Sequence, residues 1–290
     1  MIDDALTRAW TSGEVRHAYT ARDTILYALG LGYGQDPLDP LQLRHTYEQG
    51  LATLPSMAAV LASPGFWVRE RRELGIDFAK LVHGEQGLVV HRPLQPEGTL
   101  VGRSRVLRIV DKGEGKGAVL HVEKQLVDAA SGDPVATCEQ VLFLRGDGGF
   151  SARGRSDEPP PAPAPTPDTP PDVVLDWATR PEAALVYRLS GDLNPLHVDP
   201  AVATRAGFPR PILHGLATWG IACHRLVQAC CGGDATRLRS FRARLSAPVY
   251  PGETLRVEVW RTGEHEAAFR CRVPARDMVV LSHGRAGWVD

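Results

Sequence analysis

The sequence contains little that would suit a secreted or membrane-embedded protein. Its 290 residues include five cysteines, an odd number with no Cys-x-x-Cys spacing, so neither a disulfide framework nor a zinc site is predicted. No apolar run approaches the roughly 18 residues of a membrane-spanning helix. The first ten residues, MIDDALTRAW, are acidic and lack the apolar core of a signal peptide. We therefore expect a cytoplasmic protein with reduced thiols and no membrane span.

An excess of either charge is also missing. The 33 lysines and arginines nearly balance the 34 aspartates and glutamates, which gives a formal net charge of −1. Without a basic excess to neutralise phosphates, nucleic acid is a poor candidate partner. The Gly-x-Ser-x-Gly, His-Glu-x-x-His and P-loop motifs are absent, so the hydrolase, zinc-protease and nucleotide chemistries of those motifs have no support. The 43% of hydrophobic residues are enough for a sizeable core.

One proline-rich segment divides the chain. Residues 151–174 (SARGRSDEPPPAPAPTPDTPPDVV) carry prolines and acidic residues and can continue neither a helix nor a central strand. We interpret this segment as a semi-rigid linker. It separates an N-terminal domain, residues 1–150, from a C-terminal domain, residues 175–290.

The two halves resemble each other at one fixed spacing. RPLQPEGTL at 92–100 and APVYPGETL at 247–255 share two prolines, a threonine and a leucine at an offset of 155. Both stretches lead into alternating runs that contain β-branched residues. Because the linker lies between them, duplication of one domain explains the match better than chance does.

Hydrophobic patterns predict helices followed by strands in each half. A helix begins near Thr20, with Asp23 completing an imperfect capping box, and DPAVATRAG (199–207) forms a short helix that ends at Gly207. Residues 212–231 are apolar nearly all round, which indicates a longer, buried helix. An antiparallel sheet curved around a buried helix, used twice, gives an α+β architecture. Strands are expected at 98–110, 118–129, 134–146, 238–248, 253–263, 266–275 and 277–289.

The polar stretch YRLSGDLNPLHVDP (187–200) carries a carboxylate close to an imidazole. Asp192 and His197 could share one water molecule, take a proton from it and deliver a proton elsewhere, which is general acid–base catalysis. Asn194 could orient either group or the water. The alternative is a surface turn, in which Asp192 and Asn194 serve the backbone and His197 is structural.

A glycine that follows a histidine suggests a second element of the same site. In ILHGLATWG, Gly215 falls in the first turn of the apolar helix, where N–H groups lack helical partners and the helix dipole attracts negative charge. Such an N–H group could stabilise the enolate oxygen that forms when a double bond conjugated to a carbonyl takes up water. Helix entry or close packing is the alternative for Gly215, and His214 is either a structural residue or a substrate contact.

At these residues the chain resembles a known family. YRLSGDLNPLHVDPAVATRAGFPRPILHGLATWG is similar to the signature of the MaoC-like, hydratase 2 group of (R)-specific enoyl-CoA hydratases, and LVHGEQGLVVHRPL and PVYPGETL extend the resemblance to both halves. The resemblance implies a double hot-dog fold, in which each half is an antiparallel sheet wrapped around a long helix. It also implies a hydro-lyase of acyl-CoA metabolism that adds water reversibly to trans-2-enoyl-CoA, giving (R)-3-hydroxyacyl-CoA without a metal or redox cofactor.

The resemblance also assigns roles to the residues of the motif. Asp192 and His197 become the catalytic pair, Asn194 helps to position the site, and the Gly215 N–H polarises the thioester oxygen. A homodimer is plausible on the same ground.

The repeat suggests that the first half has lost these catalytic groups. At the offset of 155, PLDPLQ (37–42) aligns with DLNPLH (192–197), which places Pro37 opposite Asp192 and Gln42 opposite His197. In two-domain members of the family the first half is catalytically inert and helps to house the acyl chain. We therefore expect one active site in each chain.

Several alternatives stay open on the sequence alone. A dehydratase for a branched, steroid or polyketide-type acyl-CoA would carry the same motif, and hot-dog folds also include acyl-CoA thioesterases. A third alternative is a non-catalytic acyl-CoA binding protein. Because CoA carries phosphates, Arg242 and Arg244 are candidate substrate-binding residues together with His214, although outward-facing, solvated positions on a strand explain the two arginines equally well.

Overall fold

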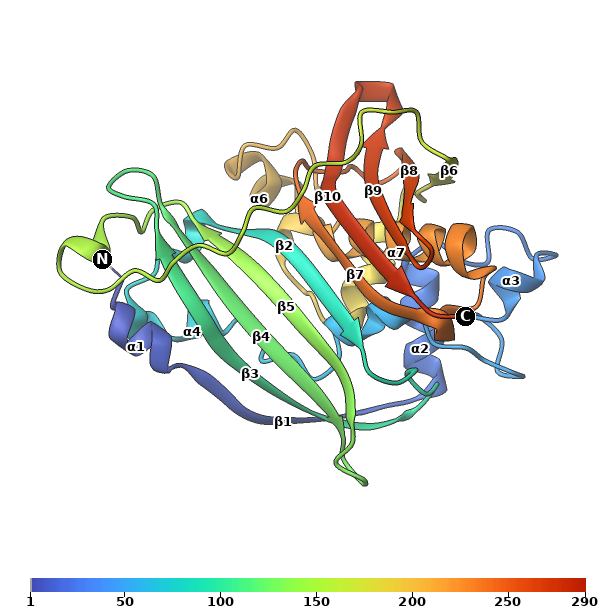
Figure 1. The fold of residues 1–290 in the computed structure, drawn as a ribbon, viewed down its shortest axis with the longest axis horizontal. Coiled ribbons are helices and arrows are strands. Elements are labelled where there is room, and N and C mark those ends of the chain that lie inside the picture. Colours follow the sequence, from blue (N-terminus) through green and yellow to red (C-terminus); the bar gives the residue numbers. More distant parts are fainter. Residues whose placement is uncertain (1) are drawn as a thin grey trace.

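The computed structural model describes residues 2–290, in which ten strands form a single antiparallel sheet (Figure 1). The strands lie in the order β1-β3-β4-β5-β2-β7-β10-β9-β8-β6. Their bounds are β1 (Thr11–Tyr19), β2 (Leu81–Val90), β3 (Gly98–Asp111), β4 (Ala118–Asp128), β5 (Pro134–Leu144), β6 (Val173–Ala178), β7 (Leu238–Leu245), β8 (Thr254–Gly263), β9 (Glu266–Val273) and β10 (Met278–Trp288).

The strand order is the same in the two halves. Counted from its outer edge, each half places its first, third, fourth, fifth and second strands side by side. The second strands, β2 and β7, pair at the centre of the sheet, from Glu85 opposite Arg244 to Val89 opposite Ser240. A repeated order is what duplication of one domain produces, so the repeat found in the sequence has a counterpart in the fold.

All seven strands expected from the sequence are present, and three further strands were missed. β1 is an edge strand whose residues are mostly exposed or half-buried, so it lacks the regular apolar alternation of a core strand. β2 contains Gly84 and Gly87, and β6 begins inside the proline-rich segment. In these strands, pairing with a neighbouring strand stabilises a sequence whose own pattern is weak.

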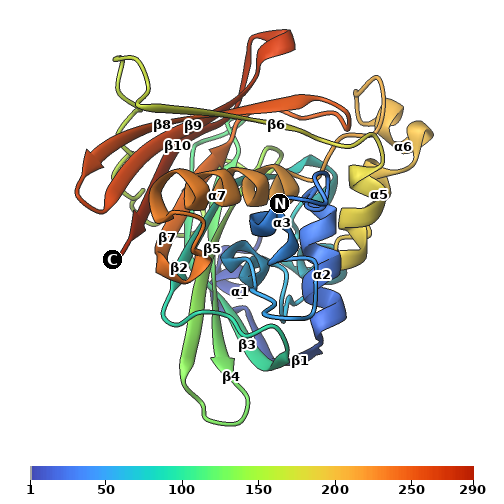
Figure 2. The same cartoon turned by 90° about the vertical axis from the view of Figure 1, so that its right-hand side faces the viewer.

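The long helix of the second half is α7 (Gly215–Cys231), which packs against β7, β8 and β10 (Figure 2). Trp219 on this helix meets Phe241 of β7 with 5.2 Å between ring centroids. In the part of the chain that the structure describes, no helix is both long and apolar enough to cross a bilayer. The other helices are α1 (Asp4–Ala9), α2 (Ala21–Gly30), α3 (Pro40–Leu43), α4 (Trp67–Glu70), α5 (Ala183–Tyr187) and α6 (Pro200–Arg205).

The two shorter helices predicted from the sequence are confirmed. Thr20 is the N-cap of α2, and Asp23 Oδ2 accepts a hydrogen bond of 2.8 Å from the Thr20 N–H, as the capping box requires. α6 begins at Pro200, directly after its N-cap Asp199. Gly207 follows this helix with a φ of +88°, in the left-handed region that favours glycine.

The double hot-dog prediction is confirmed for the molecule as a whole, and the first half departs from it in one respect. The longest helix there is α2, with 10 residues, and the short 3-10 helix η1 (Pro55–Ala59) packs against β2, β5 and α7. The buried Lys124 ammonium donates to the carbonyl oxygens of Ala58, Ala59 and Leu61 at 3.0, 2.9 and 2.5 Å. A buried cation therefore satisfies carbonyl groups at the end of a helix that does not continue.

The predicted linker follows the surface of the molecule and is held at several points (Figure 1). Trp260 Nε1 donates to the Thr169 carbonyl at 2.7 Å, and Arg285 Nη2 donates to the Ala164 and Pro165 carbonyls at 2.8 and 2.9 Å. Hydrogen bonds from strands β8 and β10 thus fix a segment that has little regular structure of its own.

Candidate active site

The candidate site is built on the loop that follows α5. Gly191 has a φ of +117°, a conformation that glycine adopts at little cost, and it turns the chain so that Asp192 begins a new segment. Asp192 Oδ1 accepts from the Asn194 N–H at 3.1 Å, and Asn194 Oδ1 accepts from the Leu196 N–H at 3.1 Å, where the 3-10 turn η6 (Pro195–His197) begins. The turn chemistry of Asp192 and Asn194 therefore forms the frame that carries His197.

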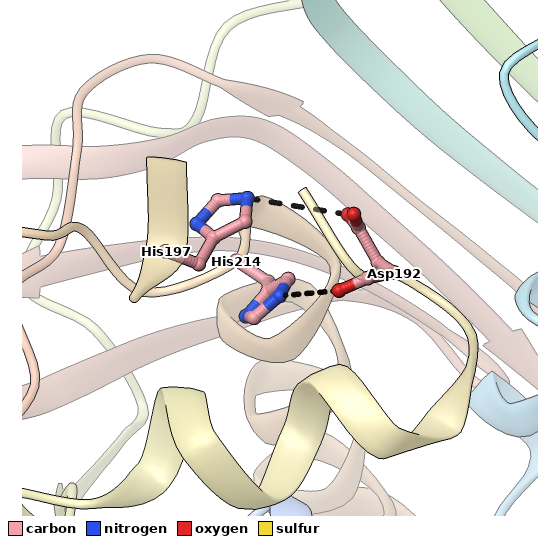
Figure 3. A group of neighbouring side chains, drawn as sticks. All are labelled: Asp192, His197 and His214. Atoms are coloured by element: carbon pink, nitrogen blue, oxygen red, sulfur yellow. Dashed lines mark hydrogen bonds and ion pairs between the residues drawn. The ribbon is translucent and has the colours of Figure 1, made fainter. Parts of the chain in front are cut away.

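Asp192 and His197 face each other across a narrow gap (Figure 3). The distance from His197 Nε2 to Asp192 Oδ2 is 4.0 Å, which is too long for a direct hydrogen bond. His197 Nδ1 lies 2.8 Å from the Ile212 carbonyl oxygen. Because a carbonyl only accepts, Nδ1 carries the proton in the neutral ring and Nε2 keeps a lone pair directed at the gap. The sequence prediction that these two side chains come together is supported by this geometry.

Burial determines the charge state of His197. Its side chain is 9% exposed, whereas that of Asp192 is 31% exposed. Burial lowers the pKa of His197, and it outweighs the Ile212 carbonyl and the Asp192 carboxylate, which both raise that pKa. His197 is therefore neutral at pH 7, as a general base must be.

His214 lies behind this pair rather than on its open side. Its Nε2 donates to the backbone carbonyl of Asp192 at 3.1 Å, and its ring stacks on the His197 ring with 3.7 Å between centroids and 27° between planes (Figure 3). It is 1% exposed. Burial, reinforced by the neighbouring His197, lowers the pKa of His214 to about 3. This placement favours the structural alternative for His214 over a substrate contact.

Gly215 begins α7 directly after its N-cap His214. The first N–H groups of a helix have no intrahelical partner, and the 17 residues of α7 add a helix dipole at this end. A Cβ atom on Gly215 would lie 3.0 Å from Leu245 Cδ1, so the space at this turn also favours glycine. The expected oxyanion donor thus lies one residue from the histidine that contacts both Asp192 and His197.

Arg242 and Arg244 pair with Glu85 of the first half rather than with a residue of this site. Their neighbours in β7, Phe241 and Ala243, are buried in the core, so the two arginines point to the opposite face of the sheet from α7. Arg242 Nη2 lies 3.3 Å from Glu85 Oε2, and Arg244 donates to Glu85 Oε1 from Nε and Nη2 at 2.9 and 2.8 Å. The structure therefore gives both arginines a partner across the junction of the two halves, and their role in binding CoA remains a prediction.

Three of these side chains could also be considered as metal ligands. Asp192, His197 and His214 each offer one ligand atom, and these atoms all lie within 4.8 Å of one another. However, the stacked imidazole rings run side by side, and Nε2 of His214 is already bonded to a carbonyl. Lone pairs on parallel rings do not converge on one point, so this arrangement suits a water molecule better than a metal ion.

Two residues near the site, Tyr187 and His83, were not among the site residues predicted from the sequence. The Tyr187 ring lies 5.0 Å from that of His214, and the hydroxyl of Tyr187 is buried. His83 of β2 belongs to the first half. Burial lowers the pKa of His83 to about 4, although the charge of Asp192 acts in the opposite direction. Tyr187 could have been found from its place in the motif, whereas nothing in the sequence brings His83 near Asp192.

The corresponding loop of the first half has kept its frame. Asp39 is the N-cap of α3 and accepts from the Leu41 N–H at 2.9 Å, as Asn194 accepts from Leu196 at the offset of 155. Gln42 stands where the second half has His197, and its Oε1 accepts from the Gln35 N–H at 3.0 Å. This loop offers no carboxylate–imidazole pair.

Two family models match the chain, one on each half. The MaoC like domain matches residues 162–280, and the MFE-2 hydratase 2 N-terminal domain matches residues 17–146. The match to the MaoC like domain begins inside the proline-rich segment.

Known proteins are similar over nearly the whole chain. The 3-hydroxyacyl-thioester dehydratase Y of Mycobacterium tuberculosis is 43% identical, over 93% of this chain and 93% of its own length. The peroxisomal enoyl-CoA hydratase 2 of Arabidopsis thaliana is 36% identical, over 96% of this chain and 91% of its own. The crystal structure of a MaoC-like dehydratase from Phytophthora capsici matches with a TM-score of 0.83 at 33% identity, covering 96% of this chain and 95% of that one.

Proposed function

The chain belongs to the MaoC-like, hydratase 2 family of hydro-lyases, and we propose that it adds water reversibly to trans-2-enoyl-CoA to give (R)-3-hydroxyacyl-CoA. One observation carries the proposal: the Asp192 carboxylate and the His197 imidazole face each other across 4.0 Å, a gap that one water molecule can bridge. The (R) configuration of the product follows from family membership.

The two side chains activate that water. His197 is neutral and directs the Nε2 lone pair into the gap, because its Nδ1–H is engaged by Ile212. Asp192 keeps Oδ2 free for the water, since Oδ1 is the atom that accepts from Asn194. As the water oxygen forms a bond to C3 of the enoyl group, one of its protons passes to this pair.

The helix N-terminus stabilises the charge that develops at the other end of the substrate. Addition at C3 shifts electrons through C2 to the thioester oxygen, where the Gly215 N–H and the dipole of α7 favour an enolate. The proton held by Asp192 and His197 then passes to C2, and the thioester carbonyl is restored. The water molecule is thus divided into a hydroxyl on C3 and a hydrogen on C2, and no further reactant is required.

The reverse reaction is the second candidate for the physiological direction. The 43% identical relative is named a 3-hydroxyacyl-thioester dehydratase, and loss of water would use the same groups in reverse order. We propose hydration and dehydration as two directions of one site, whose acyl group ranges from linear chains to branched, steroid or polyketide-type chains.

The remaining parts of the proposal concern the role of the first half, the need for a cofactor, the cellular compartment and the oligomeric state. We propose that the first half is catalytically inert and helps to house the acyl chain, which is supported by Pro37 and Gln42 at the positions of Asp192 and His197. We also propose that the reaction needs no metal or redox cofactor, that the protein works in the cytoplasm, and that it forms a homodimer. The peroxisomal relative makes the cellular compartment a point to test.

The test follows the absorbance of the conjugated thioester of crotonyl-CoA and of a medium-chain enoyl-CoA. Asp192→Asn and His197→Ala should each lower kcat by about 10²–10⁴-fold, because each removes one half of the acid–base pair. Asp199→Asn is the matched control: it makes the same chemical change in the same segment, and asparagine can still cap α6. The product goes to chiral analysis.

Rapid loss of absorbance that both site variants abolish, with an (R)-3-hydroxy product, is the expected result. A folded wild-type protein that leaves both substrates unchanged would contradict the proposal for these acyl chains. Release of free CoA from saturated acyl-CoA would instead indicate a thioesterase.

A further inference from the structure

We propose that His214 is a positioning residue that holds the Asp192 loop, the His197 ring and the first N–H of α7 in one arrangement without touching the substrate. This inference rests on the hydratase function proposed above and assigns to that site a residue outside the acid–base pair. It replaces the substrate contact that the sequence had left open for His214.

Two side-chain contacts and one backbone link connect His214 to the three parts of the site. Its Nε2–H holds the backbone carbonyl of Asp192 at 3.1 Å, so it fixes the start of the catalytic loop. Its ring lies against the His197 ring at 3.7 Å and limits how that imidazole can rotate. Its backbone is the N-cap of α7, so the Gly215 N–H moves with it.

The surroundings of His214 leave no route to a bound substrate. Its exposed fraction is 1%, with His197 stacked on one side and the Tyr187 ring 5.0 Å away. A residue in this position can act on the reaction only through its neighbours.

The hydrogen bonding of His214 is unfavourable for a residue that serves the core alone. Among the residues that the structure describes, none gives its buried Nδ1 a hydrogen-bond partner, and a buried polar atom without a partner is a cost to the folded state. Leucine or phenylalanine would avoid that cost. Neither would supply the Nε2–H bond to Asp192, and leucine would also lack the flat ring beside His197. The contacts that justify the unpartnered nitrogen are therefore those made to the catalytic residues.

The charge state of His214 supports the same role. Because burial and the neighbouring His197 lower its pKa to about 3, the His214 ring stays neutral at pH 7. A neutral ring keeps one proton on Nε2 as the donor to Asp192 and places no positive charge against His197.

Two amide substitutions separate the two nitrogens of the ring. In His214→Gln the amide nitrogen can take the place of Nε2 and donate to the Asp192 carbonyl, whereas in His214→Asn it falls near Nδ1, which has no partner. We expect His214→Asn to lower kcat by about 10–100-fold, the scale of a small misplacement of catalytic groups, and His214→Gln to retain at least ten times more of it. KM should stay within about twofold in both variants.

A readout that does not need turnover completes the test. Histidine titration by NMR should show the pKa of His197 moving back toward 6.5 in His214→Asn and staying nearer the wild-type value in His214→Gln. This readout keeps the inference testable if wild-type protein proves inactive on enoyl-CoA, an outcome that would count against the proposed function alone.

Two results would overturn the inference. A raised KM with unchanged kcat would make His214 a substrate contact. Equal kcat and equal His197 titration in the two variants, with only a lower Tm, would make it a core residue with no part in positioning the site.

Discussion

At the scale of single residues, the chemistry depends on an imidazole that stays neutral in a buried setting. His197 lies beside a carboxylate, which on its own would favour the charged ring. Burial opposes this and prevails, so the pKa of His197 is lowered from 6.5. The same side chain at an exposed position would be about half protonated at pH 6.5, and the protonated fraction could not accept a proton from water.

We predict a pH dependence from this lowered pKa. Because His197 must be neutral to act as a base, kcat/KM should be level at neutral pH and fall only below pH 6.5, as His197 gains a proton. The profile is measured with crotonyl-CoA from pH 4.5 to 8 and compared with an NMR titration of His197. A half-maximal point at or above pH 6.5 would show that the Asp192 charge outweighs burial.

Sequence reasoning at this scale succeeded where local chemistry decides the position of a residue. Asp192, Asn194 and His197 lie within one turn whose Gly, Asx and Pro residues are fixed by backbone preferences. It could not predict the stack of His214 on His197, because the two residues belong to different elements. The positive charge of Arg242 and Arg244 suggested that they bind the phosphates of CoA. In the structure both arginines form ion pairs with Glu85 of the other half.

At the scale of elements, the main departure from expectation is helix length: the longest helix described in the first half, α2, has 10 residues, whereas α7 has 17. Periodicity predicted α7 because its sequence is largely apolar and free of proline, whereas the apolar run at residues 51–68 is interrupted by Pro55, Pro64 and Gly65. The three carbonyls that Lys124 binds are the ones a longer helix would have satisfied internally. Lys124 of β4 thus supplies hydrogen bonds to a segment that lies more than 60 residues earlier in the chain.

We predict that Lys124→Met destabilises the protein by about 2–4 kcal/mol, because it leaves three carbonyl oxygens without a buried charged donor. Lys116→Met is the matched control, since Lys116 is exposed in a turn and the same change there should fall within about 0.5 kcal/mol. Chemical unfolding of the two variants measures the difference. A Lys124→Met protein as stable as the control would show that water can reach these carbonyls.

At the scale of the whole molecule, two copies of one strand order share a sheet but differ at the residues proposed to be catalytic. The loop frames match closely, with Asp39 and Asn194 capping equivalent turns. The residues around the frames differ, since Gln42 replaces the imidazole and Val60 stands at the position of Gly215. The offset of 155 already aligned the two loops in the sequence, whereas the repeated order of strands is visible only in the structure.

Restoring its two missing groups should not be enough to make the first half active. We expect Pro37→Asp with Gln42→His, placed in the inactive Asp192→Asn background, to remain inactive. The new pair would have no helix N-terminus to stabilise an enolate, because Val60 follows the short η1 instead of beginning a long helix. The change should also lower Tm, since Gln42 Oε1 accepts from the backbone N–H groups of Gln35 and Asp36.

Activity is measured on folded protein with crotonyl-CoA, and the Asp192→Asn variant alone sets the baseline. Activity regained well above that baseline would show that the first half is a dormant catalytic site whose only deficit is the acid–base pair.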